Sequence, residues 1–402
     1  MRIGIEGQRL FRREKHGMDI VAIELIKNLQ LIDPSNEYYI FVKDGDDDDW
    51  YTPSMHFHLV RTKKAPYHIW EQYILPREVI RYKIDILHCT SNTAPLWLKI
   101  PLVLTLHDII YLENFQFVSY QSTLYQLVGN FYRRFVVPSI LKKAARIITV
   151  SNSERDIILN RYPLLNHKLF VIYNAMSDSF LNIDQAKYPE VKEKFDLPDE
   201  YIFALGNSNQ KKNLPNVLKA YEIYHKNTAN PLPFILADEP PSDTFKLLSG
   251  PFSKETEQDI RFIGYVKNNE IPLLYANSSL FIYASLRESF GIPLLEAMAA
   301  GVPVITSNVS SMPEISKNAA LLVDPEKPEE IAYGISKILD DPKLAASLVK
   351  KGKKRIDTFA WIKSAAKVLE IYRVMFEEIK TRDSNRFMRK LEKSISKDKA
   401  KE

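Results

Sequence analysis

Short apolar runs alternate with segments of helical periodicity along almost the whole chain of 402 residues, and the alternation starts afresh near its middle. Strands separated by helices are typical of parallel α/β sheets, because parallel neighbours need a long crossover between them. A first series of strands is expected at Ile3–Ile5, Tyr38–Val42, Ile84–Leu87, Leu102–Leu106 and Ile147–Val150. A second series is expected at Tyr201–Leu205, Phe234–Leu236, Ile260–Ile263, Leu280–Tyr283, Val304–Thr306 and Ala320–Val323. The pattern predicts an α/β fold of two doubly wound, Rossmann-like domains.

Helices and connections complete this organisation. Helical periodicity is expected at Ile20–Leu31, Tyr125–Ala144, Leu214–Tyr224, Glu270–Ala276, Leu294–Ala300, Pro328–Leu339 and Trp361–Ile379. The polar segment Ser177–Asp199, with its two prolines, predicts a linker. We expect a first domain at 1–178, a second at 185–357, a crossing helix at 359–380 and a basic tail at 381–402. Because open α/β sheets bind ligands at the carboxyl ends of their strands, two such domains predict a central cleft.

Composition and charge exclude several classes of protein. The net charge of +5 is too small to indicate a nucleic-acid partner, and the single cysteine, Cys89, allows no intramolecular disulfide. We find neither a signal-peptide pattern nor an apolar run long enough to span a membrane. No cluster of metal-ligating residues stands out, and the acidic run Asp44–Asp49 is typical of a solvated loop. A cytoplasmic protein without a bound metal is expected.

The stretch Ser285–Pro313, SLRESFGIPLLEAMAAGVPVITSNVSSMP, carries the most chemical information. It follows an expected strand, and Pro293 suits the first turn of a helix, where we also place Glu296. Glu288 and Glu296 can then both face the strand-end crevice, where carboxylates accept pairs of sugar hydroxyls and free helix N–H groups suit a phosphate. The alternative is that Glu296 only favours the helix dipole and Glu288 is a surface loop residue.

The segment ESFGIPLLEAMAAGVPVI resembles the E-x7-E signature of glycosyltransferase family 4, and the resemblance extends through Ser307–Asp324. It implies the GT-B fold, a C-terminal helix that crosses back to the first domain, retention of anomeric configuration and no required cofactor. The donor would be a GDP- or UDP-linked sugar. By this resemblance Glu288 contacts the donor sugar and Glu296 binds the ribose. Backbone N–H groups would hold the donor at Phe290, Gly291 and Ile292.

Phe203–Leu214, FALGNSNQKKNL, resembles the strand, glycine turn and R-K-N motif of the same family. Gly206 would form the turn, and Lys212 takes the place of the lysine that holds the donor diphosphate, where a fixed cation stabilises the leaving group. Lys211 stands where arginine is usual and lacks the planar fork for a bidentate phosphate contact. Taken alone, the KKN triplet also fits an exposed helix start.

Two further segments resemble parts of the family site on the first domain. His107 in TLHD takes the place of the histidine beside the reacting sugar, with Asp108 as its neighbour, although a histidine at a strand end can also be structural. Gly17 fits a glycine-containing loop that approaches the diphosphate. This loop is basic, at Arg9, Arg12, Arg13 and Lys15, and it is not G-x-G-x-x-G, so a Rossmann dehydrogenase is poorly supported.

Acceptor-side candidates are less specific. Ser151 in VSNSERDI and Asn174 in VIYNA resemble family segments near the cleft, although Ala175 replaces the usual glycine. Tyr67–Pro76, YHIWEQYILP, looks like the acceptor-side helix of some bacterial members. Its aromatic residues could stack on an acceptor sugar, or they could belong to the core, and they are Tyr67, Trp70 and Tyr73.

The sequence therefore predicts a retaining hexosyltransferase, of mannose or glucose type, that extends a saccharide or lipid-linked saccharide in cell-surface polysaccharide synthesis. The implied mechanism is a front-face displacement in which the donor phosphate accepts the acceptor proton. A GT-B sugar epimerase and a catalytically silent sugar-binding or scaffold protein stay open as alternatives. The tail 381–402 is expected either to contact anionic lipid at the inner face of the membrane or to be a solvated, disordered segment.

Overall fold

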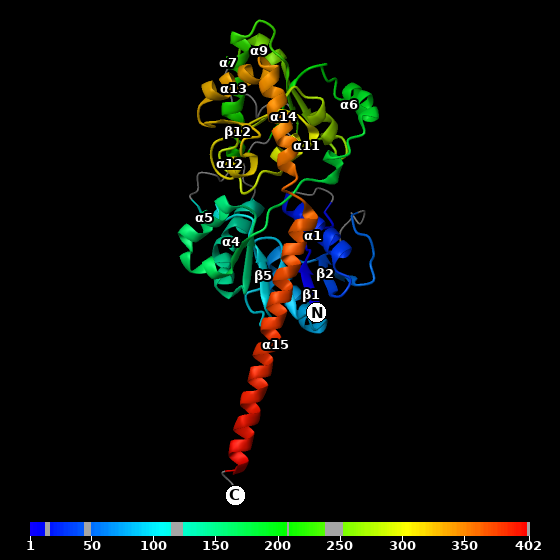
Figure 1. Ribbon diagram of the computed structural model, residues 1–402, viewed down its shortest axis with the longest axis vertical. Coiled ribbons are helices and arrows are strands. Elements are labelled where there is room, and N and C mark those ends of the chain that lie inside the picture. The colour runs from blue at the N-terminus through cyan, green and yellow to red at the C-terminus, as the bar shows by residue number, and fades with distance from the viewer. Residues whose placement is uncertain (13–16, 44–49, 114–123, 207–208, 238–251, 400–402) are drawn as a thin grey trace.

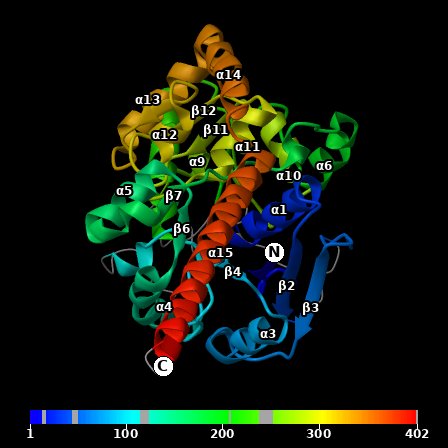
Figure 2. The ribbon, with the colours of Figure 1, turned by 60° about the horizontal axis from the view of Figure 1, so that its bottom comes forward.

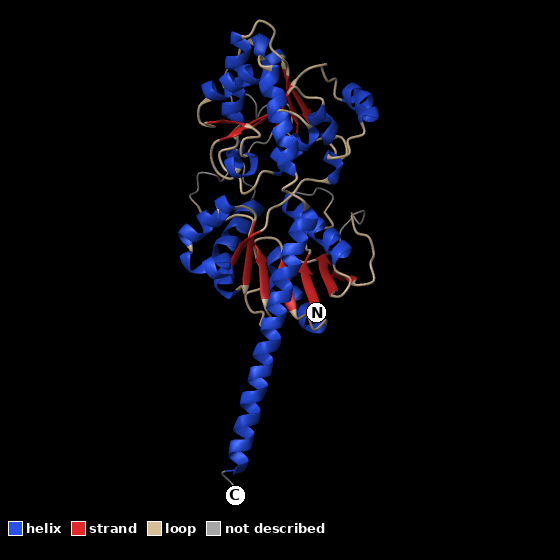
Figure 3. Cartoon of the chain, in the orientation of Figure 1, coloured by secondary structure: helices blue, strands red, loops and turns tan. Residues whose placement is uncertain are grey.

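The computed structural model describes residues 1–12, 17–43, 50–113, 124–206, 209–237 and 252–399, and for 124–128, 130, 382–383 and 385–399 it describes the backbone alone. These residues form two α/β domains stacked end to end, and a long C-terminal helix runs from the second domain along the first and beyond it (Figure 1). In each domain the strands lie inside and the helices outside (Figure 3).

The first domain contains a seven-stranded parallel sheet in the order β3-β2-β1-β4-β5-β6-β7. In chain order its elements are β1 (Arg2–Glu6), α1 (Gly17–Ile32), β2 (Glu37–Lys43), β3 (Phe57–Thr62), α2 (Tyr67–Ile69), η1 (Trp70–Ile74), α3 (Leu75–Arg81), β4 (Ile86–Cys89), β5 (Leu102–Thr105), η2 (Ile110–Leu112), α4 (Leu124–Lys143), β6 (Arg146–Thr149), α5 (Asn152–Arg161), η4 (Pro163–Lys168) and β7 (Leu169–Val171).

The second domain contains a six-stranded parallel sheet in the order β10-β9-β8-β11-β12-β13. The elements from the linker onward are η5 (Asp178–Phe180), η6 (Gln185–Lys187), α6 (Tyr188–Lys194), β8 (Ile202–Leu205), η7 (Gln210–Lys212), α7 (Leu214–Asn227), β9 (Phe234–Ala237), α9 (Lys254–Gln258), β10 (Ile260–Gly264), α10 (Ile271–Ala276), β11 (Leu280–Tyr283), α11 (Ile292–Ala300), β12 (Val304–Ser307), α12 (Met312–Ser316), β13 (Leu321–Val323), α13 (Pro328–Leu339), α14 (Pro342–Ile356) and α15 (Trp361–Lys399).

Helices cover both faces of each sheet, which explains why the central strands are continuous apolar runs. In β4, β5, β11 and β12 every residue is buried. One face of the first sheet packs against α1 and α15, and the other packs against α3 and α4. The second sheet packs against α10 and α11 on one face and against α7 and α13 on the other. The predicted doubly wound α/β architecture is confirmed.

Helix α15 ties the two domains together. It comes directly after the second domain in the chain. Its residues Val368, Leu369 and Tyr372 are buried in a core that contains Ile3 and Ile26 of the first domain. Figure 2 shows the helix crossing over α1 and the strands beside it. Its backbone stays helical to Lys399, well beyond the expected end at Ile379. No helix in the described part of the chain is long and apolar enough to cross a membrane.

Candidate active site

The switch points of the two sheets define where the chemistry lies. In the first sheet the strand order reverses between β1 and β4, and in the second between β8 and β11. Open α/β sheets bind ligands beyond the carboxyl ends of strands at such points. Glu6 ends β1 and His107 follows β5 in the first sheet, while Gly206 and Glu288 follow strands of the second. The topology therefore brings most of the predicted site residues to the carboxyl ends of the two sheets.

Lys212 and Glu288 form the charged centre of the second-domain site. The Lys212 Nζ atom lies 2.7 Å from Glu288 Oε1 and donates to the Tyr283 hydroxyl at 3.0 Å. Burial would raise the pKa of Glu288, but the charges of Lys212 and Lys211 and the hydrogen bonds from Lys212 and Tyr283 hold it below its ordinary value. Glu288 is thus an ionised carboxylate beside a cation at neutral pH.

Tyr283, at the end of β11, links the two glutamates of the E-x7-E loop. Burial raises the pKa of its hydroxyl well above the ordinary value, and the charges of Glu288 and Glu296 raise it further. Glu296 is half-buried and accepts a hydrogen bond from the Tyr275 hydroxyl at 3.4 Å. Both carboxylates therefore act on the same phenol, as expected if they share one crevice.

The turn into α11 depends on a glycine. Gly291 has φ of +98°, and a Cβ atom there would lie 2.6 Å from Met312 Cε, so any side chain would be strained. Phe290 is buried, and Ile292 begins the helix with Pro293 as its second residue. The expectation that Glu296 lies in the first turn is wrong, because a helix that begins at Ile292 places it in the second turn.

The lysine pair lies where β8 leads into α7. Gly206 N–H donates to Ala237 O at 2.6 Å, and residues 207–208 are outside the described part of the chain. Lys211 and Lys212 form a 3-10 turn capped by the Asn209 side chain. The backbone of Asn213 is left-handed (φ 64°), and its side chain donates to Ala284 O at 2.9 Å. This bond ties the lysine turn to the loop that carries Glu288.

His107 is buried beyond β5 and is held at two points. Its backbone N–H donates to Asn92 Oδ1 at 2.6 Å, and its Nε2 lies 2.9 Å from the Thr90 carbonyl. A carbonyl only accepts, so Nε2 carries the proton and Nδ1 remains an acceptor. Burial lowers the pKa of His107, which is therefore neutral at pH 7. This geometry suits a histidine that accepts a sugar hydroxyl.

Gly17 and its neighbours belong to the first-domain side of the candidate site. Gly17 begins α1 and is exposed, and a methyl group there would meet no atom within 4 Å. Arg9 Nε lies 3.0 Å from Asp19 Oδ1. The charges of both residues affect the pKa of His107, which Arg9 lowers and Asp19 raises. Of the basic loop residues predicted from the sequence, Arg13 and Lys15 lie outside the described residues, as does His16.

The aromatic residues expected on the acceptor side separate into core and surface. Trp70 is fully buried and its indole N–H donates to Thr62 Oγ1 at 2.6 Å, so of the two alternatives it belongs to the core and is not available to stack on an acceptor. Tyr73 is exposed, and the Tyr67 hydroxyl donates to Glu71 Oε1 at 3.0 Å. The segment Tyr67–Pro76 forms α2, the π-helical η1 and the start of α3.

Glu71 is the centre of a buried polar network that the sequence did not reveal. Its carboxylate accepts hydrogen bonds from Tyr67, Thr93, Tyr132 and Gln72. Burial raises its pKa to about 7 despite these hydrogen bonds, and the charge of Glu6 adds to the rise. The sequence signal available was an acid between the aromatic residues Trp70 and Tyr73.

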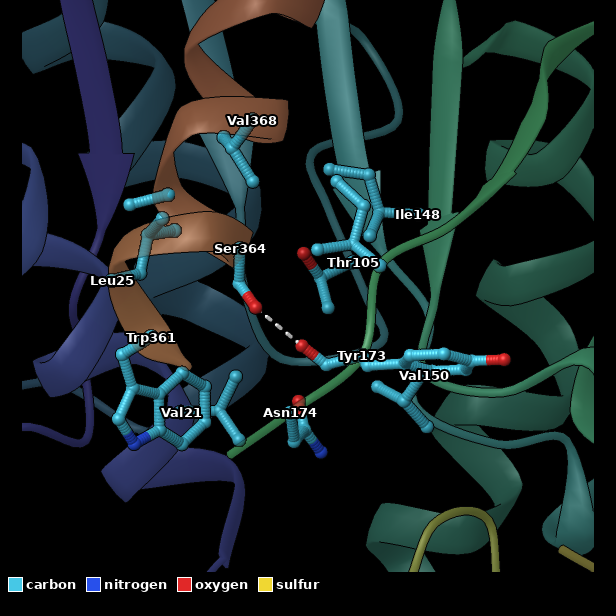
Figure 4. Close-up of a pocket in the computed structure, with 12 residues that line it drawn as sticks. Val21, Leu25, Thr105, Ile148, Val150, Tyr173, Asn174, Trp361, Ser364 and Val368 are labelled. Atoms are coloured by element: carbon cyan, nitrogen blue, oxygen red, sulfur yellow. Dashed lines mark hydrogen bonds between the residues drawn. The ribbon is translucent and has the colours of Figure 1, made fainter. Parts of the chain in front are cut away.

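Ser151, Asp108 and Asn174 lie near the boundary between the domains. Ser151 is fully buried and caps α5, while Asp108 is half-buried and accepts a hydrogen bond from Ile110 N–H at 3.2 Å. Asn174 lines a small apolar cavity of about 30 Å³ between α1 and α15, together with Trp361 and Val21 (Figure 4). A sugar nucleotide needs a pocket of roughly 300 Å³ or more, so this cavity is not the donor site.

Two family profiles match consecutive parts of the chain. One, described as Glycosyltransferase Family 4, matches residues 17–180, and the other, Glycosyl transferases group 1, matches residues 188–355. The two matches cover both domains in order. The chain belongs to glycosyltransferase family 4.

Relatives of this family 4 glycosyltransferase include two mannosyltransferases. It is similar to the O-antigen chain mannosyltransferase B of Escherichia coli, with 29% identity over 58% of this chain and 62% of that protein, less than two thirds of its length. It is also similar to the O-antigen chain mannosyltransferase RfbU of Salmonella typhimurium, with 26% identity over 66% of this chain and 68% of that protein.

Solved structures share the arrangement of the two domains. The structure of HepE from Anabaena in complex with UDP-glucose superposes with a TM-score of 0.66 at 17% identity, over 93% of this chain and 100% of that one. The fold is GT-B, with two Rossmann-like sheets and a returning C-terminal helix. In the described residues of this glycosyltransferase, no group of three His, Cys, Asp or Glu side chains comes together to hold a metal ion.

Proposed function

We propose that the chain is a retaining glycosyltransferase that transfers a hexose from a nucleoside diphosphate sugar to a saccharide or lipid-linked saccharide. The observation that carries the proposal is the ion pair between Lys212 and Glu288, a cation and a sugar-binding carboxylate held 2.7 Å apart at the switch point of the second sheet. The names of the two relatives support mannose as the sugar and surface polysaccharide synthesis as the setting.

In this proposal the diphosphate lies against the lysine turn. Negative charge builds on the diphosphate as the bond to the sugar breaks, and Lys212 neutralises it with help from Lys211. The N–H groups at the start of α11 add positive potential without a metal ion. These groups are fixed before the reaction, so little reorganisation is needed in the transition state.

The sugar itself would lie between Glu288 and His107. The ionised Glu288 accepts sugar hydroxyls, and the unprotonated Nδ1 of His107 accepts another. Since His107 is neutral and its Nε2–H is already donated to Thr90, we assign it to positioning. The acceptor hydroxyl attacks the face that the diphosphate leaves, and its proton passes to the departing phosphate oxygen.

The test is direct incubation of the purified chain with GDP-mannose, UDP-glucose and other nucleotide sugars, with short saccharide acceptors added. Transfer releases free nucleotide and extends the acceptor, and NMR of the product reports an α or β linkage relative to the donor. An isomerised donor without release of nucleotide would mean an epimerase, and unchanged donor in every reaction would mean a silent binding protein.

We also propose that the tail 381–402 binds anionic lipid. It carries eight basic residues, and its backbone continues α15 to Lys399, although the side chains beyond Ser384 lie outside the described residues. Each basic residue near an anionic surface contributes about 1 kcal/mol. Deletion of 381–402 should abolish co-sedimentation with phosphatidylglycerol vesicles at low salt. Sedimentation that is the same with and without the tail would overturn this part of the proposal.

A further inference from the structure

The contacts between the two domains gather on the loop that carries Glu288. Arg287, directly before it, points to the first domain, and its Nη2 lies 2.7 Å from Glu154 Oε2 and 3.2 Å from Glu113 Oε1. The Arg287 side chain is 8% exposed and that of Glu154 is fully buried. A buried ion pair between residues 133 positions apart thus joins the donor-site loop to the first domain.

Both neighbours of Glu288 are fixed from the first domain. The Ser151 hydroxyl donates to Ser289 O at 2.6 Å and accepts from Glu154 N–H at 3.0 Å. The other nitrogen of the guanidinium, Nη1 of Arg287, donates to Glu288 O at 3.1 Å. The first turn of α5 therefore holds the backbone on each side of the sugar-binding carboxylate.

The same turn also holds the loop that carries His107. The second carboxylate oxygen of Glu154, Oε1, accepts from Ile109 N–H at 3.1 Å, two residues beyond His107. One carboxylate thus connects the His107 loop of the first domain with Arg287 of the second.

We infer that Arg287 and Glu154 are positioning residues that align Glu288 with His107 across the domain boundary. The inference rests on the proposed function, since alignment has meaning only where both residues meet one sugar. A buried ion pair contributes little net stability, because the loss of solvation offsets the attraction. Its geometry is nonetheless specific, and a displacement of about 1 Å in a reacting group can lower a rate by about a hundredfold.

A second contact across the boundary shows that docking of the domains does not depend on this pair alone. The Glu314 carboxylate of α12 accepts from the N–H groups of Asn152 and Ser153 at 2.9 Å each, and from the Tyr173 hydroxyl at 2.7 Å. This contact holds α5 against the second domain but does not touch the residues that flank Glu288. Loss of the Arg287–Glu154 pair should therefore loosen the loop and widen the range of domain positions, while the Glu314 contact keeps the domains docked.

The test is steady-state kinetics of Arg287→Gln, Glu154→Gln and the double variant with the donor identified for the wild type. We expect each single variant to lower kcat by about 10- to 100-fold, because alignment is lost in the transition state. The KM for the donor should change by about twofold or less, since Lys212 and Glu296 remain in place. The double variant should be no slower than the slower single variant, because the two residues act as one unit.

The matched control is Arg146→Gln. Arg146 forms an arginine–glutamate ion pair with Glu378 on α15, far along the chain from Glu288; this pair lies at the surface, and its loss should leave kcat unchanged. A kcat near the wild-type value in both single variants, or losses that multiply in the double variant, would overturn the inference.

A spectroscopic measurement separates this inference from the proposed function. Spin labels at the exposed positions Lys99→Cys and Lys343→Cys report the distance between the domains, and the native Cys89 is buried. We expect Arg287→Gln to broaden the distance distribution and Arg146→Gln to leave it unchanged. If the wild type transfers no sugar and the two variants still differ in this way, the proposed function is refuted, while the role of the Arg287–Glu154 pair in holding the domains is retained. Identical distributions in all three proteins would refute the pairing itself.

Discussion

The two sheets have the same order of strands around their switch points, yet they place different titratable groups at the carboxyl ends of those strands. On the second domain the switch point carries Lys211, Lys212 and the ionised Glu288. On the first domain it carries Glu6, whose pKa is raised by burial, and the neutral His107. The difference teaches that the fold supplies two equivalent crevices, and that the residues which follow the strands decide which one receives the charged part of a substrate.

A lysine turn on one side, and on the other a neutral histidine beside the paired charges of Arg9 and Asp19, suit a ligand that carries its negative charge at one end. A nucleoside diphosphate sugar has a charged diphosphate at one end and a neutral hexose at the other. In the proposed function the diphosphate lies at the lysine turn and the hexose at the boundary with His107. The following experiments test that division.

The largest effect is expected at Lys212. Lys212→Ala should lower kcat by about 100- to 1,000-fold, as does the loss of other fixed groups that stabilise developing charge. The matched control is Lys219→Ala on the exposed side of α7, which should leave kcat unchanged. Steady-state kinetics on folded protein measure both kcat values. Near-normal turnover of Lys212→Ala would mean that the diphosphate binds elsewhere.

The first domain also predicts an unusual dependence of stability on pH, through the buried carboxyl group of Glu71. Burial raises the pKa of Glu71 to about 7 in the folded chain, while the unfolded chain has the ordinary value, 4.5. The folded state therefore binds the proton of the Glu71 carboxyl group more tightly than the unfolded state does. The stability that this proton contributes is fully present below pH 4.5 and is lost as the pH rises through 7. The loss amounts to about 3 kcal/mol at most.

Urea unfolding at pH 5 and pH 8 measures this effect. The free energy of unfolding of Glu71→Gln should fall less over this range than that of the wild type. The remaining slope comes from other groups, because burial also raises the pKa of Glu6. Equal slopes for the variant and the wild type would mean that Glu71 is ionised in the fold.

A smaller effect is expected at Glu296. If Glu296 binds the ribose, which does not change during the reaction, Glu296→Ala should raise the KM for the donor by about tenfold and leave kcat near its wild-type value. Tyr275→Phe is the control, since it removes the hydroxyl that donates to Glu296 and keeps the carboxylate. A fall in kcat with unchanged KM would move Glu296 from the ribose to the reacting sugar.

The smallest effect is expected from removal of metal ions. If Lys212 and the helix N–H groups neutralise the diphosphate, EDTA should change the rate by about twofold or less, because no metal is needed as a Lewis acid. Addition of Mg²⁺ or Mn²⁺ to chelated enzyme is the control. A large loss in EDTA that either metal restores would show that the charge at the lysine turn is insufficient.

The sequence by itself determined the elements that depend on local pattern. Strand β11 and helix α13 begin and end at the predicted residues, because a continuous apolar run and a 3.6-residue period are local properties. Strand β3 escaped prediction because its side chains are only partly buried at the edge of the sheet, so FHLVRT mixes polar and apolar residues. The glycosyltransferase family and the order of its motifs were likewise present in the sequence.

Only the tertiary structure decided which of these residues meet. Trp70 belongs to the core because η1 turns its ring inward toward Thr62, and no helical spacing distinguishes that outcome from an exposed face. Arg287 contacts Glu154 because the carboxyl ends of two separate sheets face each other. The local sequence around either residue does not predict this contact. Pairings of this kind follow from the packing of distant elements, since burial and distance are properties of the folded chain alone.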